Sequence, residues 1–377
     1  MNGVRVAFID QVGGAAGGAE ETLATFLENA LPGIDAHAIL FEDGAFAERL
    51  RQLGTVVDVL DVPAAISAST RERVRLGGAL HVPRIALATA ALLRRRRIQL
   101  AYTNSMKAHF VGAMAARAAG IPCVMHFHDI IGGAGLTALR VAALFGSRER
   151  VACSQMVSRT IGVGVTSVIY GPVELAAYAT LPDPRVARAG LGLPLDVPIV
   201  AIVGRINRWK GHDRFLRIAA RVNAQIEAHF AIVGAPIFRD ADFVPELHTL
   251  ADTLGVRDRV TFVPWLDDVR EIYAACEVNA NCSTREPFGR AVVEAAACGV
   301  PTVCFDDSGA AETIVDGATG RTIAAGDEAA FAAAIVDLLS SPSKHARMSA
   351  AARSATDRFD AAGIAEQMSV VIRRAAA

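Results

Sequence analysis

Short apolar segments alternate with longer helical patterns along most of the chain, and this alternation constrains the fold more than any other feature. The first half contains the segments VRVAFID, DAHAILF, IQLAYTN and IPCVMHF, each followed by a helical pattern. Apolar runs of strand length between helices indicate parallel β-α-β units, in which the sheet is buried on both faces. The sequence therefore predicts an α/β fold built on parallel sheets.

The same alternation restarts in the second half of the chain. The segment 174–196 carries three prolines and little strand pattern, and VPIVAIVG follows it at 197–204. A chain of 377 residues is long enough for two or three domains of about 150 residues. We expect two Rossmann-like domains facing each other across a cleft, at residues 1–172 and 173–357, with a C-terminal helix at 358–377 that packs back on the first. Ligands of such sheets bind at the carboxyl ends of the strands.

The composition narrows the class of protein. Hydrophobic residues make up 52% and charged residues 20%, which is typical of a globular chain. A formal net charge of -1 gives no global attraction to nucleic acid, so no nucleic-acid partner is expected. The six cysteines form no C-x-x-C pair and lie mostly in apolar runs, which favours a reducing cytoplasm. No window of about 18 apolar residues and no signal peptide are apparent.

An apolar stretch at 80–93 is followed by four arginines, Arg94 to Arg97. Cationic residues are common at the C-terminus of a helix, and this interpretation is the simpler one. The alternative is that the arginines contact lipid phosphates, which would make the protein a peripheral membrane protein. The oligomeric state leaves no signal in the sequence.

The segment VGRINRWKGHDRFL places two cations at the end of a predicted strand. Arg205 follows Gly204, and Lys210 opens the next helix five residues later. Two cations at a strand end and a helix start can converge on a diphosphate, although solvated surface charges would give the same spacing. Lysine occurs at only three positions in the chain, so a lysine here is more informative than usual.

Two glutamates lie in the segment STREPFGRAVVEAAACGVPTV. Glu286 precedes a predicted helix, which we expect to contain Pro287 in its first turn, and Glu294 lies eight residues on, about 12 Å along a helix. This separation suits two carboxylates that accept hydrogen bonds from hydroxyl groups at opposite ends of an extended ligand. The amides of Phe288 and Gly289 lie between them and are available to phosphate oxygens. The alternative is a helix-start acid and a surface charge, but an unpaired Glu294 would be costly in so apolar a run.

The glycine-rich segment at 13–21 follows the first predicted strand. It loosely matches a dinucleotide-binding loop, which leaves an NAD(P)-dependent reductase as an alternative. A short-chain reductase also needs a tyrosine and a lysine four residues apart, and none of the four tyrosines has a lysine at that offset. The reductase interpretation therefore lacks its catalytic pair.

Together these motifs resemble the family 4 retaining glycosyltransferases of the two-domain GT-B fold. The resemblance runs nearly end to end, through GGAE, IPCVMHFHD, G-R-x4-K-G, EPFG with Glu294, CGVPTV and SGAAETIVDGATG. It implies a nucleotide-sugar donor in the C-terminal domain, with the diphosphate held by Arg205 and Lys210. It further implies that Glu286 binds the sugar hydroxyls and Glu294 the ribose, and that the amides of Gly17 and Gly18 face the phosphate from across the cleft.

The resemblance also implies roles in the N-terminal domain. His128 lies six residues after Pro122, where the family has a histidine beside the reacting sugar. His126 is an alternative candidate. The candidates for binding the acceptor are Asn104, His126 and Asp129. Asn104 would also be an ordinary helix-capping residue. Pro264 stands where the family commonly has a glycine near the base, so the identity of the base is open.

The implied reaction is transfer of a sugar with retention of configuration and with no metal or other cofactor. UDP-sugars are the first expectation for the donor and GDP-mannose the next. The acceptor is open among lipid-linked sugars, polysaccharide precursors and small metabolites. The one metal-like motif, Asp240-Ala-Asp242, is interpreted as a loop and helix cap. A nucleotide-sugar 2-epimerase or a glycogen-phosphorylase-like enzyme would share the two-domain plan, although the order of motifs suits the transferase better. A non-catalytic sugar-nucleotide sensor would keep the same donor pocket and remains an alternative.

Overall fold

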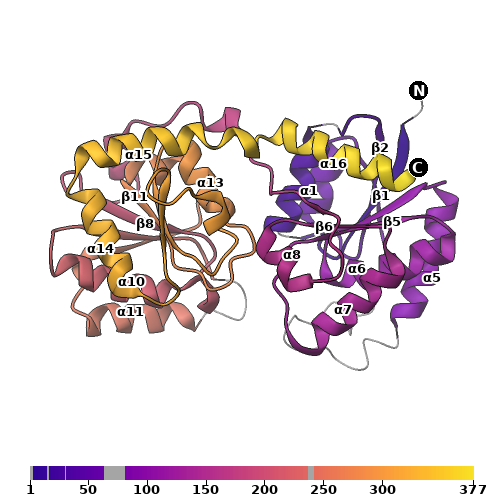
Figure 1. The fold of residues 1–377 in the computed structure, drawn as a ribbon, viewed down its shortest axis with the longest axis horizontal. Coiled ribbons are helices and arrows are strands. Elements are labelled where there is room, and N and C mark those ends of the chain that lie inside the picture. The colour runs from indigo at the N-terminus through magenta and orange to yellow at the C-terminus, as the bar shows by residue number, and fades with distance from the viewer. Residues whose placement is uncertain (1–2, 15–16, 30, 63–80, 237–241) are drawn as a thin grey trace. The chain divides into compact units, whose positions relative to one another are not determined.

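The computed structural model describes residues 3–14, 17–29, 31–62, 81–236 and 242–377. The chain forms two compact units (Figure 1). The first contains residues 1–172 and 360–377, and the second contains residues 173–359. The last helix, α16 (Ala361–Ala376), belongs to the first unit, where it packs against α1 (Gly18–Glu28).

The first unit contains a seven-stranded parallel sheet in the order β3-β2-β1-β4-β5-β6-β7. Its strands are β1 (Val4–Asp10), β2 (Ile34–Leu40), β3 (Val56–Val59), β4 (Leu100–Thr103), β5 (Cys123–Phe127), β6 (Glu149–Ala152) and β7 (Ser167–Val168). Its other helices are α2 (Ala45–Gln52), α5 (Val82–Arg95), α6 (Met106–Ala119), α7 (Gly133–Gly146) and α8 (Gln155–Ile161). The order reverses between β1 and β4, and ligands of parallel sheets bind at such reversals.

Two helical layers cover this sheet (Figure 1). One apolar core joins α1, α2 and α16 to the strands, through side chains such as Phe8, Phe26, Tyr102 and Met368. On the other face α5 packs against α6, and α6 against α7. Strands β4 and β5 are buried at every residue, as expected of near-continuous apolar runs between two layers of helices.

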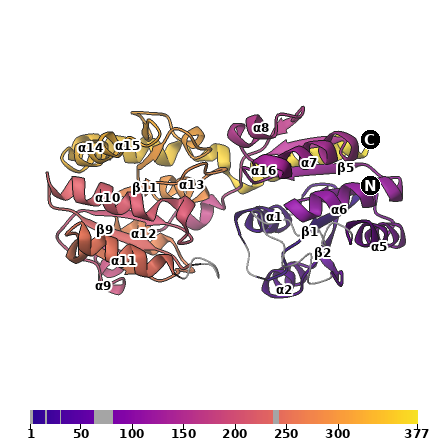
Figure 2. The ribbon, with the colours of Figure 1, turned by 90° about the horizontal axis from the view of Figure 1, so that it is seen from below.

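The second unit has a six-stranded parallel sheet in the order β10-β9-β8-β11-β12-β13. Its strands are β8 (Ile199–Val203), β9 (His229–Val233), β10 (Val260–Val263), β11 (Val278–Asn281), β12 (Thr302–Phe305) and β13 (Gly320–Ile323). Its α-helices are α9 (Pro184–Gly190), α10 (His212–Asn223), α11 (Phe243–Thr253), α12 (Arg270–Ala275), α13 (Arg290–Ala297), α14 (Glu328–Leu339) and α15 (Pro342–Ser354). One core lies under α10, α11 and α14 and a second under α9, α12 and α13; Figure 2 shows these elements from below.

The fold confirms most of the elements predicted from sequence, with two differences. The proline-containing segment 174–196 forms a 3-10 turn, η1 (Leu175–Tyr178), and helix α9, which begins where the side chain of Asp183 accepts two backbone N–H groups. The prediction that Pro287 lies in the first turn of a helix is wrong. Helix α13 begins at Arg290, because Gly289 before it adopts a left-handed conformation with φ of 88°.

The six cysteines are free and buried, which confirms their interpretation as small hydrophobic residues. None of the helices in the described part of the chain is long and apolar enough to cross a membrane.

Candidate active site

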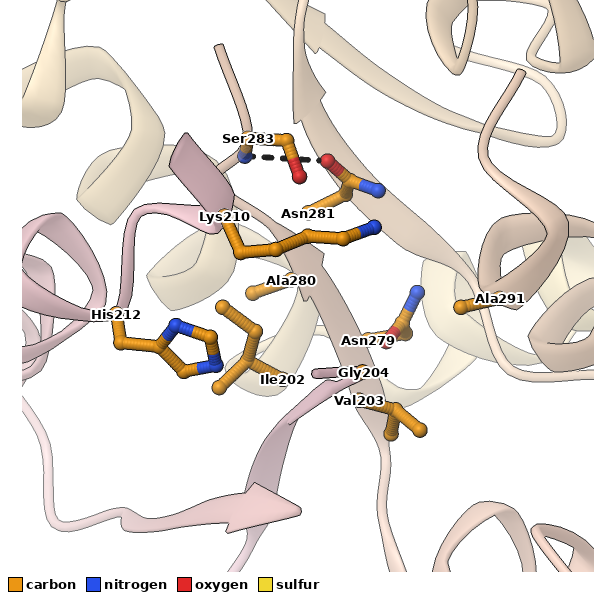
Figure 3. A pocket seen from close by; sticks show the side chains of 10 residues that line it. All are labelled: Ile202, Val203, Gly204, Lys210, His212, Asn279, Ala280, Asn281, Ser283 and Ala291. Atoms are coloured by element: carbon orange, nitrogen blue, oxygen red, sulfur yellow. Dashed lines mark hydrogen bonds between the residues drawn. The ribbon is translucent and has the colours of Figure 1, made fainter. Parts of the chain in front are cut away.

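A pocket in the second unit lies at the carboxyl ends of β8 and β11, where the strand order reverses. It encloses about 260 Å³, part of which is open to solvent. Its walls come from β8 and the loop after it, the start of α10, β11 and the loop after it, and α13. The lining residues are Ile202, Val203, Gly204, Lys210, His212, Asn279, Ala280, Asn281, Ser283 and Ala291 (Figure 3). The long side chain of Lys210 extends past Asn281 in this view. The pocket therefore combines a cation with several uncharged polar groups.

The loop from β8 to α10 holds Lys210 through local hydrogen bonds and one close backbone approach. Asn207 caps a short 3-10 turn, η2 (Arg208–Lys210), by accepting a hydrogen bond from the Lys210 amide at 3.1 Å. Gly211 has a φ of 77°, and a Cβ placed on it would lie 2.1 Å from the carbonyl oxygen of Cys282. Only glycine fits there, so the loops after β8 and β11 come into direct contact.

Lys210 and Glu286 form a nearly buried ion pair. Lys210 Nζ lies 2.6 Å from Glu286 Oε2, and the two side chains are 16% and 7% exposed. The Ser283 hydroxyl donates to the same oxygen at 2.7 Å. Glu286 Oε1 makes no hydrogen bond within the described ranges, so one carboxylate oxygen stays available to a hydroxyl donor. A polar ligand could therefore bind to Lys210 and Glu286 by replacing the hydrogen bond between them.

Arg205 supplies a second positive charge near the pocket. It follows Gly204 in the loop after β8 and is half-buried. Its guanidinium makes no ion pair or hydrogen bond with any residue that the structure describes. A half-buried guanidinium that no described carboxylate neutralises is suited to bind an anion.

Glu294 lies in α13 and is paired. Arg290 Nε donates to Glu294 Oε1 at 2.8 Å, one helical turn apart, and the Glu294 side chain is 13% exposed. Tyr178 of η1 lies close enough that Glu294 contributes, after burial, to raising the pKa of the phenol. The ion pair explains how a carboxylate is tolerated in the apolar run of α13, since Arg290 neutralises it.

The remaining predicted donor residues lie around the same edge of the sheet at different distances from the pocket. Phe288 is buried against Phe359, with ring centroids 5.8 Å apart. Gly289 is the N-cap of α13. Pro264 follows β10, is exposed, and is not among the residues that line the pocket, because β9 separates β10 from β8. The structure thus brings Gly204, Lys210 and Glu286 together and leaves Pro264 apart.

In the first unit, a hydrogen-bonded cluster joins the carboxyl ends of β1, β4 and β5. Asn104 donates from Nδ2 to Asp10 Oδ2 at 2.7 Å and to the carbonyl oxygen of Ala19 at 3.0 Å. Its Oδ1 lies 2.9 Å from Nε2 of His128. Because the amide oxygen can only accept, His128 must carry its proton on Nε2. Burial lowers the pKa of His128 to about 3, so the ring is neutral and its Nδ1 is an acceptor.

The other predicted residues of this edge differ in exposure. His126 is fully buried and its Nδ1 is bonded to the hydroxyl of Tyr102, so it belongs to the core. Asp129 is half-buried beside the cluster, and its charge contributes to a raised pKa of Glu20. His128 and Asp129 are therefore the more accessible of the three.

The glycine loop is held by Glu20. Gly17 is the N-cap of α1, and its amide donates to Glu20 Oε2 at 2.8 Å, so this amide is already occupied, and Gly18 begins the helix. Burial, followed by repulsion from Asp10 and Asp129, raises the pKa of Glu20 to about 7. An anion would have to displace this carboxylate to reach the Gly17 amide.

We expect the Glu20→Gln variant to be more stable than the native protein above pH 7. The folded-state pKa of about 7 exceeds the ordinary 4.5, so the native protein loses stability as pH rises from about 4.5 to 7. Glutamine keeps the acceptor for Gly17 and removes the charge, which should raise the free energy of unfolding by on the order of 2 kcal/mol at pH 8. Melting curves at pH 5 and pH 8 measure the difference.

The gain should nearly vanish at pH 5, where the native Glu20 is protonated in the folded state. Glu48→Gln, in the exposed first turn of α2, is the control and should show little dependence on pH over this range. An equal gain at both pH values would mean that the carboxylate of Glu20 does not titrate near 7.

Several pocket residues escaped the sequence analysis. Asn279 and Asn281 are buried on β11, where Asn279 donates to Thr302 Oγ1 at 3.0 Å and Asn281 accepts from the Ser283 amide at 3.2 Å. The signal was present, since two asparagines at alternate positions of a buried strand are unusual. Arg290 could have been found from its i,i+4 spacing to Glu294.

No group of three potential metal ligands is found in the residues that the structure covers. Asp240 lies outside the described residues. Asp242 is at the N-cap position of α11, where its side chain makes no capping hydrogen bond.

Two family models match this chain. The Glycosyl transferase 4-like domain matches residues 17–169, and Glycosyl transferases group 1 matches residues 185–355. Two Rossmann-like units with parallel sheets of seven and six strands, the second with a polar pocket at its strand reversal, match the GT-B fold of solved glycosyltransferases. The chain belongs to the family 4 glycosyltransferases and is a transferase enzyme.

Solved structures of similar proteins cover nearly the whole chain. HepE of Anabaena, crystallised in complex with UDP and glucose, is 28% identical over 98% of this chain and 99% of its own, with a TM-score of 0.84. Sucrose-phosphate synthase of Thermosynechococcus elongatus has a TM-score of 0.82 over 98% of each chain, and at 21% identity it shares the fold.

Curated relatives match this chain over a shorter region. D-inositol 3-phosphate glycosyltransferase of Mycobacterium avium is 37% identical over 198 residues, which is 51% of this chain and 46% of the relative. D-inositol 3-phosphate glycosyltransferase 2 of Catenulispora acidiphila is 36% identical over 167 residues, which is 42% of this chain and 39% of the relative. The matched region thus spans less than half the length of these relatives.

Proposed function

We propose that this protein transfers a sugar from a nucleoside-diphosphate sugar to an acceptor hydroxyl with retention of configuration. The observation that carries the proposal is the Lys210–Glu286 pair at the strand reversal, together with Arg205 in the same loop, whose guanidinium pairs with none of the described residues. This set offers cations for a diphosphate and a carboxylate for sugar hydroxyls. A UDP-sugar is the first candidate for the donor, supported by the UDP and UDP-glucose complexes of HepE, and GDP-mannose is the second.

Donor binding in this proposal exchanges the partners of the ion pair. Lys210 turns from Glu286 to the diphosphate, and Glu286 then accepts hydrogen bonds from the sugar. Glu294, which is paired with Arg290, accepts hydrogen bonds from the ribose hydroxyls. The amides of Phe288 and Gly289 donate to phosphate oxygens. Each new contact replaces one that is lost, so the buried charges are not left uncompensated.

The chemical step forms a bond between the acceptor oxygen and the anomeric carbon and breaks the bond from that carbon to the phosphate. Attack comes from the side of the leaving group, and a phosphate oxygen of the donor takes the proton of the acceptor. Lys210 and Arg205 stabilise the charge that grows on the diphosphate, so the proposal requires no metal ion or other cofactor. Activity assayed with excess chelator should therefore match activity without it.

In the proposal, the polar cluster of the first unit forms hydrogen bonds with the reacting sugar and with the acceptor. The neutral ring of His128 offers Nδ1 as a hydrogen-bond acceptor, and Asn104 fixes the ring through Nε2. Asp129 is the accessible carboxylate beside it. The acceptor belongs to one of three classes, namely lipid-linked sugars, polysaccharide precursors or small metabolites. Six free, buried thiols suit a reducing compartment, and we place the enzyme in the cytoplasm.

Ligand-induced thermal stabilisation tests the donor proposal. The purified protein is melted in millimolar UDP, GDP, ADP, dTDP or NADP⁺, because a ligand at 100 times its Kd stabilises by about 2.7 kcal/mol. We expect a rise in melting temperature with one nucleoside diphosphate and none with NADP⁺. Lys210→Ala should reduce this rise, whereas Lys344→Ala on α15 should leave it unchanged. A rise with NADP⁺ alone would contradict the transferase and favour a reductase.

Product analysis with the donor that this screen selects separates the remaining alternatives. A transferase releases nucleoside diphosphate in proportion to glycosylated acceptor. A 2-epimerase would change the donor sugar with no acceptor present, and a sensor would bind the donor without any product. Either of these results would overturn the proposed reaction while leaving the donor pocket in place.

A further inference from the structure

Three neighbouring helices of the first unit present apolar side chains to solvent. Helices α5, α6 and α7 form one layer on the sheet (Figure 1). The exposed apolar residues of this layer are Leu87 (65% exposed), Met114 (44%), Val141 (52%), Leu144 (54%) and Phe145 (77%). In α7 they recur at intervals of three and four residues, which makes a stripe along one side of the helix. A surface helix normally turns such a stripe towards the core.

The same three helices are strongly basic. They contain Arg84, Arg94, Arg95, Lys107, Arg117 and Arg140, and no aspartate or glutamate. Over residues 82–148, nine lysines and arginines stand against Asp129 alone, which gives a formal charge of +8 in a chain of net charge -1. An excess of positive charge and five of the exposed large apolar side chains thus occur in the same layer of helices.

Several of these cations gather at one end of the layer. Arg94 donates to the carbonyl oxygen of Ala118, which joins the C-terminal ends of α5 and α6. Arg95, Arg97 and Arg117 are exposed there, and none of the three forms an ion pair with a described carboxylate. This end leads into the amino ends of the strands, at the edge opposite to Asn104 and His128. A contact here would leave the polar cluster of the first unit uncovered.

We propose that this outer surface of α5, α6 and α7 docks on an anionic lipid bilayer. The apolar side chains of the three helices enter the boundary between headgroups and acyl chains, and the arginines contact lipid phosphates. A bilayer provides an apolar phase and a layer of negative charge side by side, which matches both properties of the surface. The inference does not depend on the donor or on the reaction proposed above.

A second copy of the chain fits this surface poorly. In a symmetric dimer the surface would meet its own image, so the exposed arginines of the two copies would face each other across the contact. Nucleic acid would satisfy the arginines but would leave Leu144 and Phe145 without an apolar partner. The combination of charge and apolar exposure therefore favours lipid.

Vesicle co-sedimentation tests the proposal. The full chain is mixed with vesicles of phosphatidylcholine alone or of phosphatidylcholine with 30% phosphatidylglycerol, at low and at high salt. We expect at least tenfold tighter binding to the anionic vesicles at low salt, and weaker binding at high salt because ions screen the arginines. Equal or absent binding to the two kinds of vesicle at low salt would overturn the proposal.

Variants of the exposed side chains show which surface binds. Leu144→Ser with Phe145→Ser should weaken binding at least tenfold, as should Arg95→Gln with Arg97→Gln and Arg117→Gln. The matched controls are Val186→Ser, which is 68% exposed on α9, and Arg221→Gln on α10, and both should bind like the native protein. Binding that the surface variants leave unchanged would contradict this docking site.

Two further measurements make the result specific. Melting with UDP should give the same stabilisation for native protein and surface variants, so a failure of lipid binding is distinguished from a failure of the donor proposal. Sedimentation velocity reports self-association. A dimer that Phe145→Ser dissociates would assign the surface to a second copy and overturn the lipid proposal.

Discussion

Replacing Lys210 with alanine should lower kcat by about a hundredfold or more while the fold is retained. The ammonium lies in the pocket at 2.6 Å from Glu286, and in the proposed reaction it turns to the leaving diphosphate. One preorganised donor to charge that develops in a transition state is typically worth about 3 to 4 kcal/mol. Initial rates with saturating donor measure the effect. Arg205→Ala should give a loss of similar size.

The design of the Lys210 experiment must separate chemistry from stability. Lys210→Ala leaves the carboxylate of Glu286 buried with only the Ser283 hydroxyl as a partner, which costs stability by itself. The double variant Lys210→Ala with Glu286→Gln removes both charges and should regain much of that stability without regaining activity. Lys344→Ala is the control lysine. Unchanged turnover in both Lys210→Ala and Arg205→Ala would contradict their assignment to the diphosphate.

Replacing Gly211 with alanine should destabilise the second unit by about 3 kcal/mol or more and lower turnover further than the lost stability explains. The Cβ would lie 2.1 Å from the Cys282 carbonyl oxygen, and the φ of 77° is unfavourable for alanine. Relief of the clash moves the loop after β8 away from the loop after β11, and this movement separates Lys210 from Glu286. Thermal melting and initial rates measure the two effects.

Gly255→Ala is a matched control for Gly211→Ala. Gly255 has a φ of 68°, and nothing lies within 4 Å of the Cβ that alanine would add. Its replacement therefore measures the cost of a left-handed alanine alone, about 1 kcal/mol, with turnover unchanged. Similar losses in the two variants would show that the contact between the loops at Gly211 is not tight.

Patterns within single segments were sufficient to predict much of the fold. The alternation of apolar runs and helical patterns predicted two parallel-sheet Rossmann-like units, and the structure and the GT-B relatives confirm this fold class. The order of motifs predicted a family 4 glycosyltransferase, which the two family models confirm. The predicted start of α13 is wrong, because Pro287 lies outside the helix, which begins only after the left-handed Gly289.

The partners of the charged residues depend on strand order. Lys210 and Glu286 are 76 residues apart in the chain and meet because β8 and β11 are neighbours in the sheet. In the same way, Asp10, Asn104 and His128 form one cluster because β1, β4 and β5 are adjacent. The sequence alone determined most of the strands and helices, since apolar periodicity is a local signal. The tertiary structure decided which of their ends meet, because the order of strands in a sheet depends on packing across the whole unit.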